Sequence, residues 1–119
     1  MKKIMVVDDE TDLLAGIKGF LERAGYSVAV TTTCKEGVDI LASFNPDIIF
    51  LDINVGNEDG REMCRHIKSL ADHKHIPIVL ISANDDDLKT YQEYDANSFL
   101  KKPFRPSQLL DVALLFEAF

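Results

Sequence analysis

The sequence lacks the features that mark membrane proteins and secreted disulfide-bonded proteins. No apolar run approaches the ~18 residues that a membrane span requires. Only two cysteines are present, Cys34 and Cys64, and they have no metal-ligand spacing, which suits a reducing cytosol. Met1 is followed by two lysines, a short apolar run and acidic residues, so no signal peptide is visible. These absences predict a cytoplasmic domain that does not contact a membrane.

Positive charge is also scarce, with 13 Lys and Arg against 20 Asp and Glu and a formal net charge of −7. Phosphate backbones bind basic surfaces, so we do not expect this domain to contact nucleic acid directly. The hydrophobic fraction of 46% and the charged fraction of 28% are those of an ordinary globular protein. A length of 119 residues predicts a single domain over residues 1–119.

Short apolar runs alternate with helical periodicities from one end of the chain to the other. The expected strands are 4–7, 27–30, 48–51, 78–81 and 98–100. The expected helices are 13–24, 34–44, 63–71, a short polar helix around 88–91, and a last helix from Pro106 to about 117. The first should have Thr11 or Asp12 as its N-cap and end at Gly25. Three of the strand runs are continuously apolar, as in strands covered on both faces. The pattern predicts a flavodoxin-like (βα)5 α/β fold, a doubly wound parallel sheet with strand order 2-1-3-4-5.

Four of the five expected strands are followed by a polar group that could join one site. Asp8 and Asp9 follow the first strand, Asp52 ends the third, Ser82 the fourth, and Lys102 follows the fifth. Parallel sheets bind ligands beyond the carboxyl ends of their strands, and strands one and three are neighbours in the expected order.

The residue types at these strand ends indicate a phosphoryl site beside a divalent metal. Like carboxylates ~4 Å apart cost about 4 kcal/mol per pair at an effective dielectric constant of 20, so a cation is needed. Oxygen ligands without His or Cys suit Mg²⁺. A lysine and a hydroxyl add donors for an oxyanion, and a carboxylate can itself be the nucleophile. No glycine-rich phosphate loop is present, so a nucleotide is not the expected ligand.

Five segments together resemble a known family over the whole chain. They are 6–10 (VVDDE), 47–52 (DIIFLD), 59–60 (DG), 76–83 (IPIVLISA) and 99–104 (FLKKPF). In this order and spacing they are similar to two-component response-regulator receiver domains.

The resemblance implies a role for each residue of the site. Asp52 would accept a phosphoryl group from a histidine kinase or a histidine phosphotransfer protein. Mg²⁺ would be held by Asp9, Asp52 and the backbone carbonyl of Asn54, with Asp8 acting partly through water. Lys102 would contact the phosphoryl oxygens. By this resemblance the domain is a switch with slow self-dephosphorylation and not a turnover enzyme.

The resemblance also implies how the signal leaves the site. Ser82 would move to hydrogen-bond the phosphoryl group, and Phe99 would turn inward into the vacated space. This movement would change the face formed by helix 4, strand 5 and helix 5. The Lys102–Pro103 bond would be cis. Independently of any switch role, Phe99 is expected to belong to the core.

Three departures from the family pattern affect the loops. Gly56-Asn57 stands where many receivers have Pro-Gly, and Asp95 stands in place of the usual glycine before Ala96. The stretch from Ser82 to Phe99 is about two residues short, which predicts a short or irregular fourth helix.

The last helix has more apolar residues than one core face requires. Leu109, Val112, Ala113, Phe116 and Phe119 form the expected core face, and Leu110, Leu114 and Leu115 flank it. We expect this surplus to contact a second copy of the chain or a following output domain.

The sequence argues against two other functions and one other metal site. A haloacid-dehalogenase-type phosphatase would place a second acid two residues after the nucleophile, where this chain has Asn54. A docking module that has lost its switch would not keep the full residue set. His73 and His75, separated by Lys74, are expected to lie in a solvated loop and not to bind metal.

Overall fold

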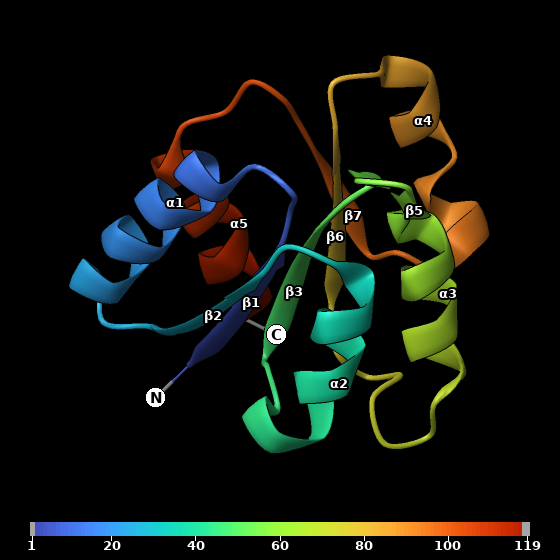
Figure 1. The fold of residues 1–119 in the computed structure, drawn as a ribbon, viewed down its shortest axis with the longest axis horizontal. Coiled ribbons are helices and arrows are strands. Elements are labelled where there is room, and N and C mark those ends of the chain that lie inside the picture. The colour runs from blue at the N-terminus through green and yellow to red at the C-terminus, as the bar shows by residue number, and fades with distance from the viewer. Residues whose placement is uncertain (1, 118–119) are drawn as a thin grey trace.

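The structure, a computed structural model, describes residues 2–117 and contains a five-stranded parallel sheet (Figure 1). Its strands are β1 (Lys3–Val7), β2 (Ser27–Thr31), β3 (Ile48–Asp52), β6 (Ile78–Ser82) and β7 (Ser98–Lys101). They lie in the order β2-β1-β3-β6-β7. Numbered along the chain as five strands, this is the order 2-1-3-4-5, so the predicted flavodoxin-like topology is confirmed.

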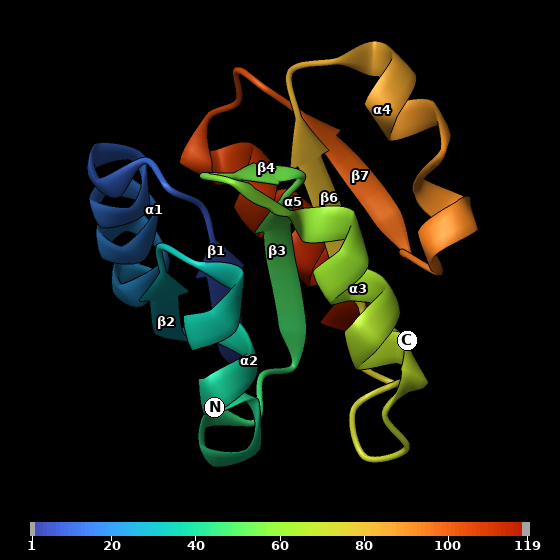
Figure 2. The same cartoon turned by 45° about the vertical axis from the view of Figure 1, so that its right-hand side comes forward.

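Helices cover both faces of this sheet (Figures 1 and 2). One face carries α1 (Thr11–Arg23) and α5 (Pro106–Glu117). The opposite face carries α2 (Cys34–Phe44), α3 (Gly60–Ser69) and the short α4 (Asp85–Lys89), which is followed by a 3₁₀ turn at Tyr91–Tyr94. The arrangement is the doubly wound architecture that alternating strands and helices predict.

The continuously apolar strands are buried because each contributes to two cores. In β1, Ile4 and Val6 face the α1/α5 side, whereas Met5 and Val7 face the α2/α3 side, and all four are fully buried. The same alternation holds in β3 and β6. A side chain period of two explains why such a strand needs apolar residues at every position.

The helix ends agree with the predictions in part. Gly25 follows α1 with φ = 99°, as a left-handed helix stop requires. The predicted N-cap of α1 is wrong: the cap is Glu10, whose side chain makes no capping hydrogen bond. The backbone N–H of Glu10 donates to Asp8 Oδ1. Helix α3 ends at Ser69, two residues before the predicted Ala71.

A small hairpin between β3 and α3 was not predicted. Strands β4 (Asn54–Val55) and β5 (Glu58–Asp59) pair antiparallel around Gly56-Asn57. Gly56 has φ = 60°, which glycine adopts without steric cost. A Gly-Asn pair between two short runs is a hairpin signal that the sequence did contain.

The region of α4 is short and irregular, as predicted. Helix α4 has five residues, and its N-cap Asn84 accepts hydrogen bonds from Asp86 N and Asp87 N. The chain then leaves the 3₁₀ turn through Asp95, whose φ of 63° explains why the usual residue there is glycine.

Helix α5 buries Leu109 and Ala113 and leaves Leu114 and Leu115 exposed by 48% and 63%. Val112 and Phe116 are half-buried against the core, and the predicted contact of Phe119 lies outside the described residues.

Of the helices in residues 2–117, none is long and apolar enough to cross a membrane.

Candidate functional site

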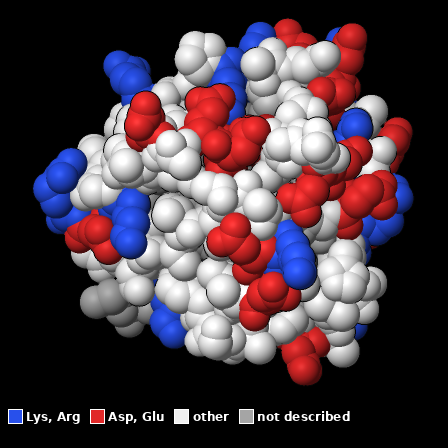
Figure 3. Space-filling model, in the orientation of Figure 1, with Lys and Arg blue, Asp and Glu red and all other residues white. Residues whose placement is uncertain are grey.

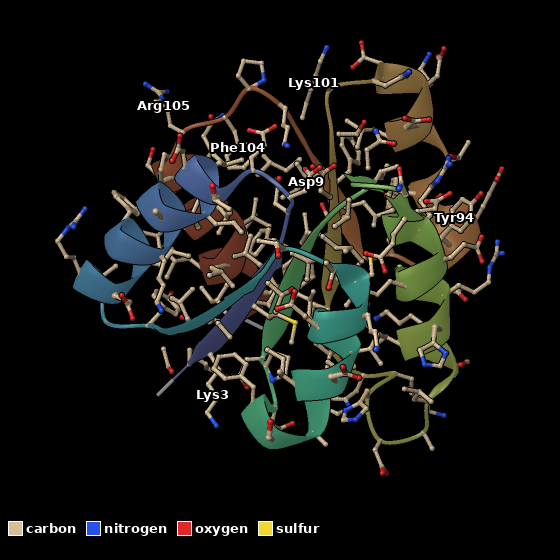
Figure 4. All side chains as sticks on the ribbon, viewed as in Figure 1. Lys3, Asp9, Tyr94, Lys101, Phe104 and Arg105 are labelled. Atoms are coloured by element: carbon tan, nitrogen blue, oxygen red, sulfur yellow. The ribbon has the colours of Figure 1, made fainter. Side chains whose placement is uncertain are left out.

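The three predicted carboxylates come together at the carboxyl ends of two neighbouring central strands. Asp8 and Asp9 follow β1, and Asp52 ends β3, whose pairing with β1 aligns Val7 with Leu51. One carboxylate oxygen from each aspartate lies within 4.8 Å of the others. Asp9 lies above the centre of Figure 4, and Lys3, near the bottom, marks the opposite end of β1.

Backbone N–H groups orient each carboxylate. Asp8 Oδ1 accepts from Glu10 N at 2.9 Å, Asp52 Oδ1 from Asn54 N at 3.0 Å, and Asp9 Oδ2 from Gly56 N at 3.0 Å. Asp8 and Asp52 are buried, whereas Asp9 is exposed. Two carboxylates of the site are therefore buried at the end of the sheet, and the third, that of Asp9, is exposed to solvent.

Lys102 reaches the cluster from the loop after β7. Its Nζ lies 2.8 Å from Asp52 Oδ2, 2.9 Å from Asp8 Oδ2 and 3.4 Å from Glu10 Oε1. The Lys102–Pro103 peptide bond is cis, as the resemblance implied. One ammonium group among the three aspartates leaves two formal negative charges, the charge that one divalent cation would neutralise.

The carboxylates fit a hard divalent cation. Asp8 Oδ2 is buried, and its partner among the described residues is the Lys102 ammonium group, 2.9 Å away. Carboxylate oxygens are the ligands that Mg²⁺ prefers. Figure 3 shows acidic side chains gathered at the upper centre of this view, over the strand ends.

Burial and the neighbouring charges shift the pKa values at the centre. The pKa of Asp52 is raised from 3.8 to about 6, because burial and, to a lesser degree, the charge of Asp8 outweigh the hydrogen bonds from Lys102 and Asn54 N, which lower it. Burial lowers the pKa of Lys102, but its hydrogen bonds and charge interactions with Asp52 and Asp8 outweigh this and raise the value above its ordinary range. Asp52 is thus a carboxylate whose charged form the fold disfavours, beside a lysine that stays charged.

Ser82 lies at the same edge of the sheet and has a partner of its own. It is buried at the end of β6, one residue beyond Ile81, which pairs with Asp52. Its Oγ accepts a hydrogen bond from Asn84 N at 3.0 Å. In this conformation the hydroxyl stabilises the turn into α4.

Phe99 does not belong to the core, and that prediction is wrong. Its side chain is 46% exposed, because β7 is the edge strand and alternates half-buried with exposed residues. Its ring centroid lies 5.2 Å from that of Tyr91. Beside it, Lys101 pairs with Asp85 of α4 at 2.9 Å. Phe99 therefore points outward, against Tyr91.

Two contributors to the site were missed from the sequence. Glu10 was noted only as part of a motif, yet it contacts Lys102 and fixes Asp8 through its N–H. Gly56 was noted only as a departure in a loop. Each acts through a backbone N–H, which any residue except proline carries, so the residue type alone offers no signal.

We predict that Asp52 makes the free energy of unfolding depend on pH. With its pKa raised from 3.8 to about 6, folded Asp52 binds a proton more tightly than the unfolded chain does. The stability that this proton contributes is fully present below pH 3.8 and is lost as the pH rises through about 6.

Relative to Asp52→Asn, wild type should therefore lose up to about 3 kcal/mol between about pH 4 and pH 7.5. Urea unfolding of both proteins with a chelator measures the difference. A difference that is constant with pH, or that changes in the opposite direction, would contradict the raised pKa.

Comparison of the sequence and the fold relates the chain to known proteins. The model of the family described as "Response regulator receiver domain" matches residues 4–114. The chain is 34% identical over 110 residues to the response regulator MprA of Mycolicibacterium vanbaalenii, covering 91% of this chain and 47% of that protein. It is 32% identical over 106 residues to the transcriptional regulatory protein YxdJ of Bacillus subtilis, covering 87% and 45%. The chain thus spans about half the length of these curated relatives.

Solved structures share the fold over nearly the full length. The beryllofluoride-activated N-terminal receiver domain of RstA from Klebsiella pneumoniae superimposes with a TM-score of 0.86 at 26% identity, covering 97% of both chains. The chemotaxis protein CheY4 of Vibrio cholerae gives a TM-score of 0.90 at 24% identity, covering 98% of both, which supports the fold alone. Receiver domains are signalling domains and not turnover enzymes, and they bind Mg²⁺ at an acidic pocket. The chain belongs to the response-regulator receiver domains of two-component signalling, a family of phosphorylation-based switches.

Proposed function

We propose that Asp52 is the phosphoacceptor of this receiver domain. The observation that carries the proposal is a buried carboxylate at the end of a central strand, with Lys102 Nζ 2.8 Å from one of its oxygens. Desolvation disfavours its negative charge, and formation of an acyl phosphate removes the charge from the carboxylate itself. The lysine is already placed to donate to an added anion.

The residues around Asp52 fit a bound Mg²⁺. We assign Asp9, Asp52 and the backbone carbonyl of Asn54 as direct ligands, with Asp8 acting partly through water. When bound, the ion neutralises charge on the phosphoryl oxygens and brings them to the acidic cluster. Asn54 belongs to β4, whose pairing with β5 fixes the backbone of this ligand.

The chemistry is transfer of a phosphoryl group from a phosphohistidine of a histidine kinase or histidine phosphotransfer protein. An oxygen of Asp52 forms a bond to phosphorus as the phosphorus–nitrogen bond breaks, and the imidazole leaves with the electron pair. Lys102 donates hydrogen bonds to the charge on the transferred group. Hydrolysis of the acyl phosphate by water resets the domain, and this self-dephosphorylation is slow.

Ser82 and Phe99 then form the switch. A phosphoryl group adds roughly −1.5 to −2 charge and three acceptor oxygens beside Ser82. The Ser82 hydroxyl turns from Asn84 N to donate to this group, and Phe99 turns inward from its exposed position. The switch changes the face formed by α4, β7 and α5. A ligand shifts an equilibrium only by its differential affinity for the two states, so one or two new hydrogen bonds give a partial shift.

Exposed Leu114 and Leu115 on α5 supply a contact surface for a second copy of the chain. Receiver domains interact with histidine kinases and output domains, and we propose that this one, residues 1–119, does so in the cytoplasm.

The phosphoacceptor assignment predicts a single phosphoryl adduct. Intact-mass spectrometry after incubation with acetyl phosphate should show one adduct that requires Mg²⁺. Asp52→Asn should show none, and Asp111→Asn, which changes an exposed aspartate of α5, should match wild type. An adduct that persists in Asp52→Asn would show that another group is the nucleophile.

The switch assignment predicts that Ser82→Ala uncouples Phe99 from the site. Adding beryllofluoride and Mg²⁺ should move the aromatic NMR signals of Phe99 in wild type. Loss of one hydrogen bond to a charged group should shift the conformational equilibrium about tenfold or more toward the outward state. The control is Ser107→Ala, at an exposed position of α5. Phe99 signals that move equally in Ser82→Ala would refute this coupling.

The α5 surface predicts self-association in the activated state. Wild type at tens of micromolar with beryllofluoride should sediment as a dimer, and Leu115→Glu as a monomer. Ala42→Glu, an apolar-to-acidic change on exposed α2, should leave the dimer intact. A wild-type monomer with and without beryllofluoride would count against this surface.

A further inference from the structure

The exposed carboxylate of the cluster is held from an unexpected direction. Asp9 Oδ2 accepts a hydrogen bond at 3.0 Å from the N–H of Gly56, which is 47 residues away in the sequence. Within residues 2–117 this is the one hydrogen bond or ion pair of the Asp9 side chain. Asp8 and Asp52 are fixed by burial and Lys102, so only Asp9 depends on a single contact for its orientation.

The donor belongs to a braced element. Gly56 begins the turn of the β4–β5 hairpin, and the hairpin is tied at three further points. Asn54 N donates to Asp52 Oδ1, Glu58 Oε1 accepts from Cys34 N at 2.8 Å, and Gly60 N donates to Ile53 O at 2.7 Å. The N–H of Gly56 is therefore presented at a fixed place and is not part of a freely moving loop.

The hydrogen bond to Asp9 requires a residue other than proline at position 56. The many similar receivers with Pro-Gly in this loop have a proline here, and proline has no N–H. Gly56 supplies the N–H and also adopts the φ of 60° that the turn requires.

We propose that Gly56 is a positioning residue for the metal site: its N–H holds Asp9 Oδ2 and thereby leaves Oδ1 oriented for Mg²⁺. Ordering the ligand before the cation arrives lowers the entropic cost of binding, as outer-shell partners of metal ligands do. The hairpin thus positions two of the three direct ligands: the carbonyl of Asn54, which lies in β4, and the carboxylate of Asp9, which the N–H of Gly56 holds. This inference rests on the proposed Mg²⁺ site.

The test compares Mg²⁺ affinity, measured by titration calorimetry, in wild type, Gly56→Pro and Gly56→Asn. A Cβ at position 56 would meet no atom within 4 Å, and asparagine tolerates a positive φ, so Gly56→Asn keeps the N–H in place. Gly56→Pro should weaken Mg²⁺ binding by about threefold to tenfold. This effect is at or below the usual range for outer-shell partners of a metal ligand, because the Gly56–Asp9 hydrogen bond is exposed to solvent. Gly56→Asn should stay within about twofold of wild type.

Amide hydrogen exchange at Gly56 tests the contact without changing the turn. Exchange should be slow in wild type with a chelator, equally slow with saturating Mg²⁺, and faster in Asp9→Ala. Wild-type affinity in Gly56→Pro, or loss of Gly56 protection when Mg²⁺ binds, would overturn the positioning role. Absence of Mg²⁺ binding in wild type would instead refute the metal site itself, and the inference with it.

Discussion

Mutual repulsion among the carboxylates of Asp8, Asp9 and Asp52 is the constraint on which the site depends. Their oxygens lie within 4.8 Å of one another at the edge of a sheet, where two of them are removed from water. Such an arrangement is unfavourable unless positive charge is supplied. Lys102 supplies part of it through the ion pairs to Asp8 and Asp52. The remaining negative charge suits a divalent cation, as we propose for Mg²⁺.

The fold supports this unfavourable cluster with backbone rather than with additional side chains. The N–H groups of Glu10, Asn54 and Gly56 each donate to one aspartate. Close packing of the chain behind the site keeps these donors in place: a Cβ on Gly60 would overlap the carbonyl oxygen of Asp52. The glycine at the start of α3 is thus required by the close approach of the loop to the end of β3. The repulsion among the carboxylates lowers the stability of the fold, and in return the geometry of the site is set before a ligand binds.

The β7 edge of the sheet is less buried than its centre. β7 is an edge strand, α4 has only five residues, and Phe99 contacts Tyr91 at the surface. Ser82 connects this region to the site, because its hydroxyl accepts from the first turn of α4 and its carbonyl accepts from Lys102 N. A rigid centre joined to a lightly packed edge is the arrangement that a two-state switch requires.

The sequence by itself determined the topology and the edge of the sheet at which the predicted polar side chains meet. Uninterrupted apolar runs in β1, β3 and β6 required cover on both faces, and alternation with helices required a parallel sheet, which in turn collected Asp8, Asp9, Asp52, Ser82 and Lys102 at one edge. Side-chain identity carries that information. Tertiary structure decided what identity does not encode: the outward position of Phe99 on an edge strand, the cap of α1 at Glu10, and the hairpin that brings Gly56 N to Asp9. These features depend on where backbone donors and strand edges fall in three dimensions, and every residue except proline carries the same backbone donor.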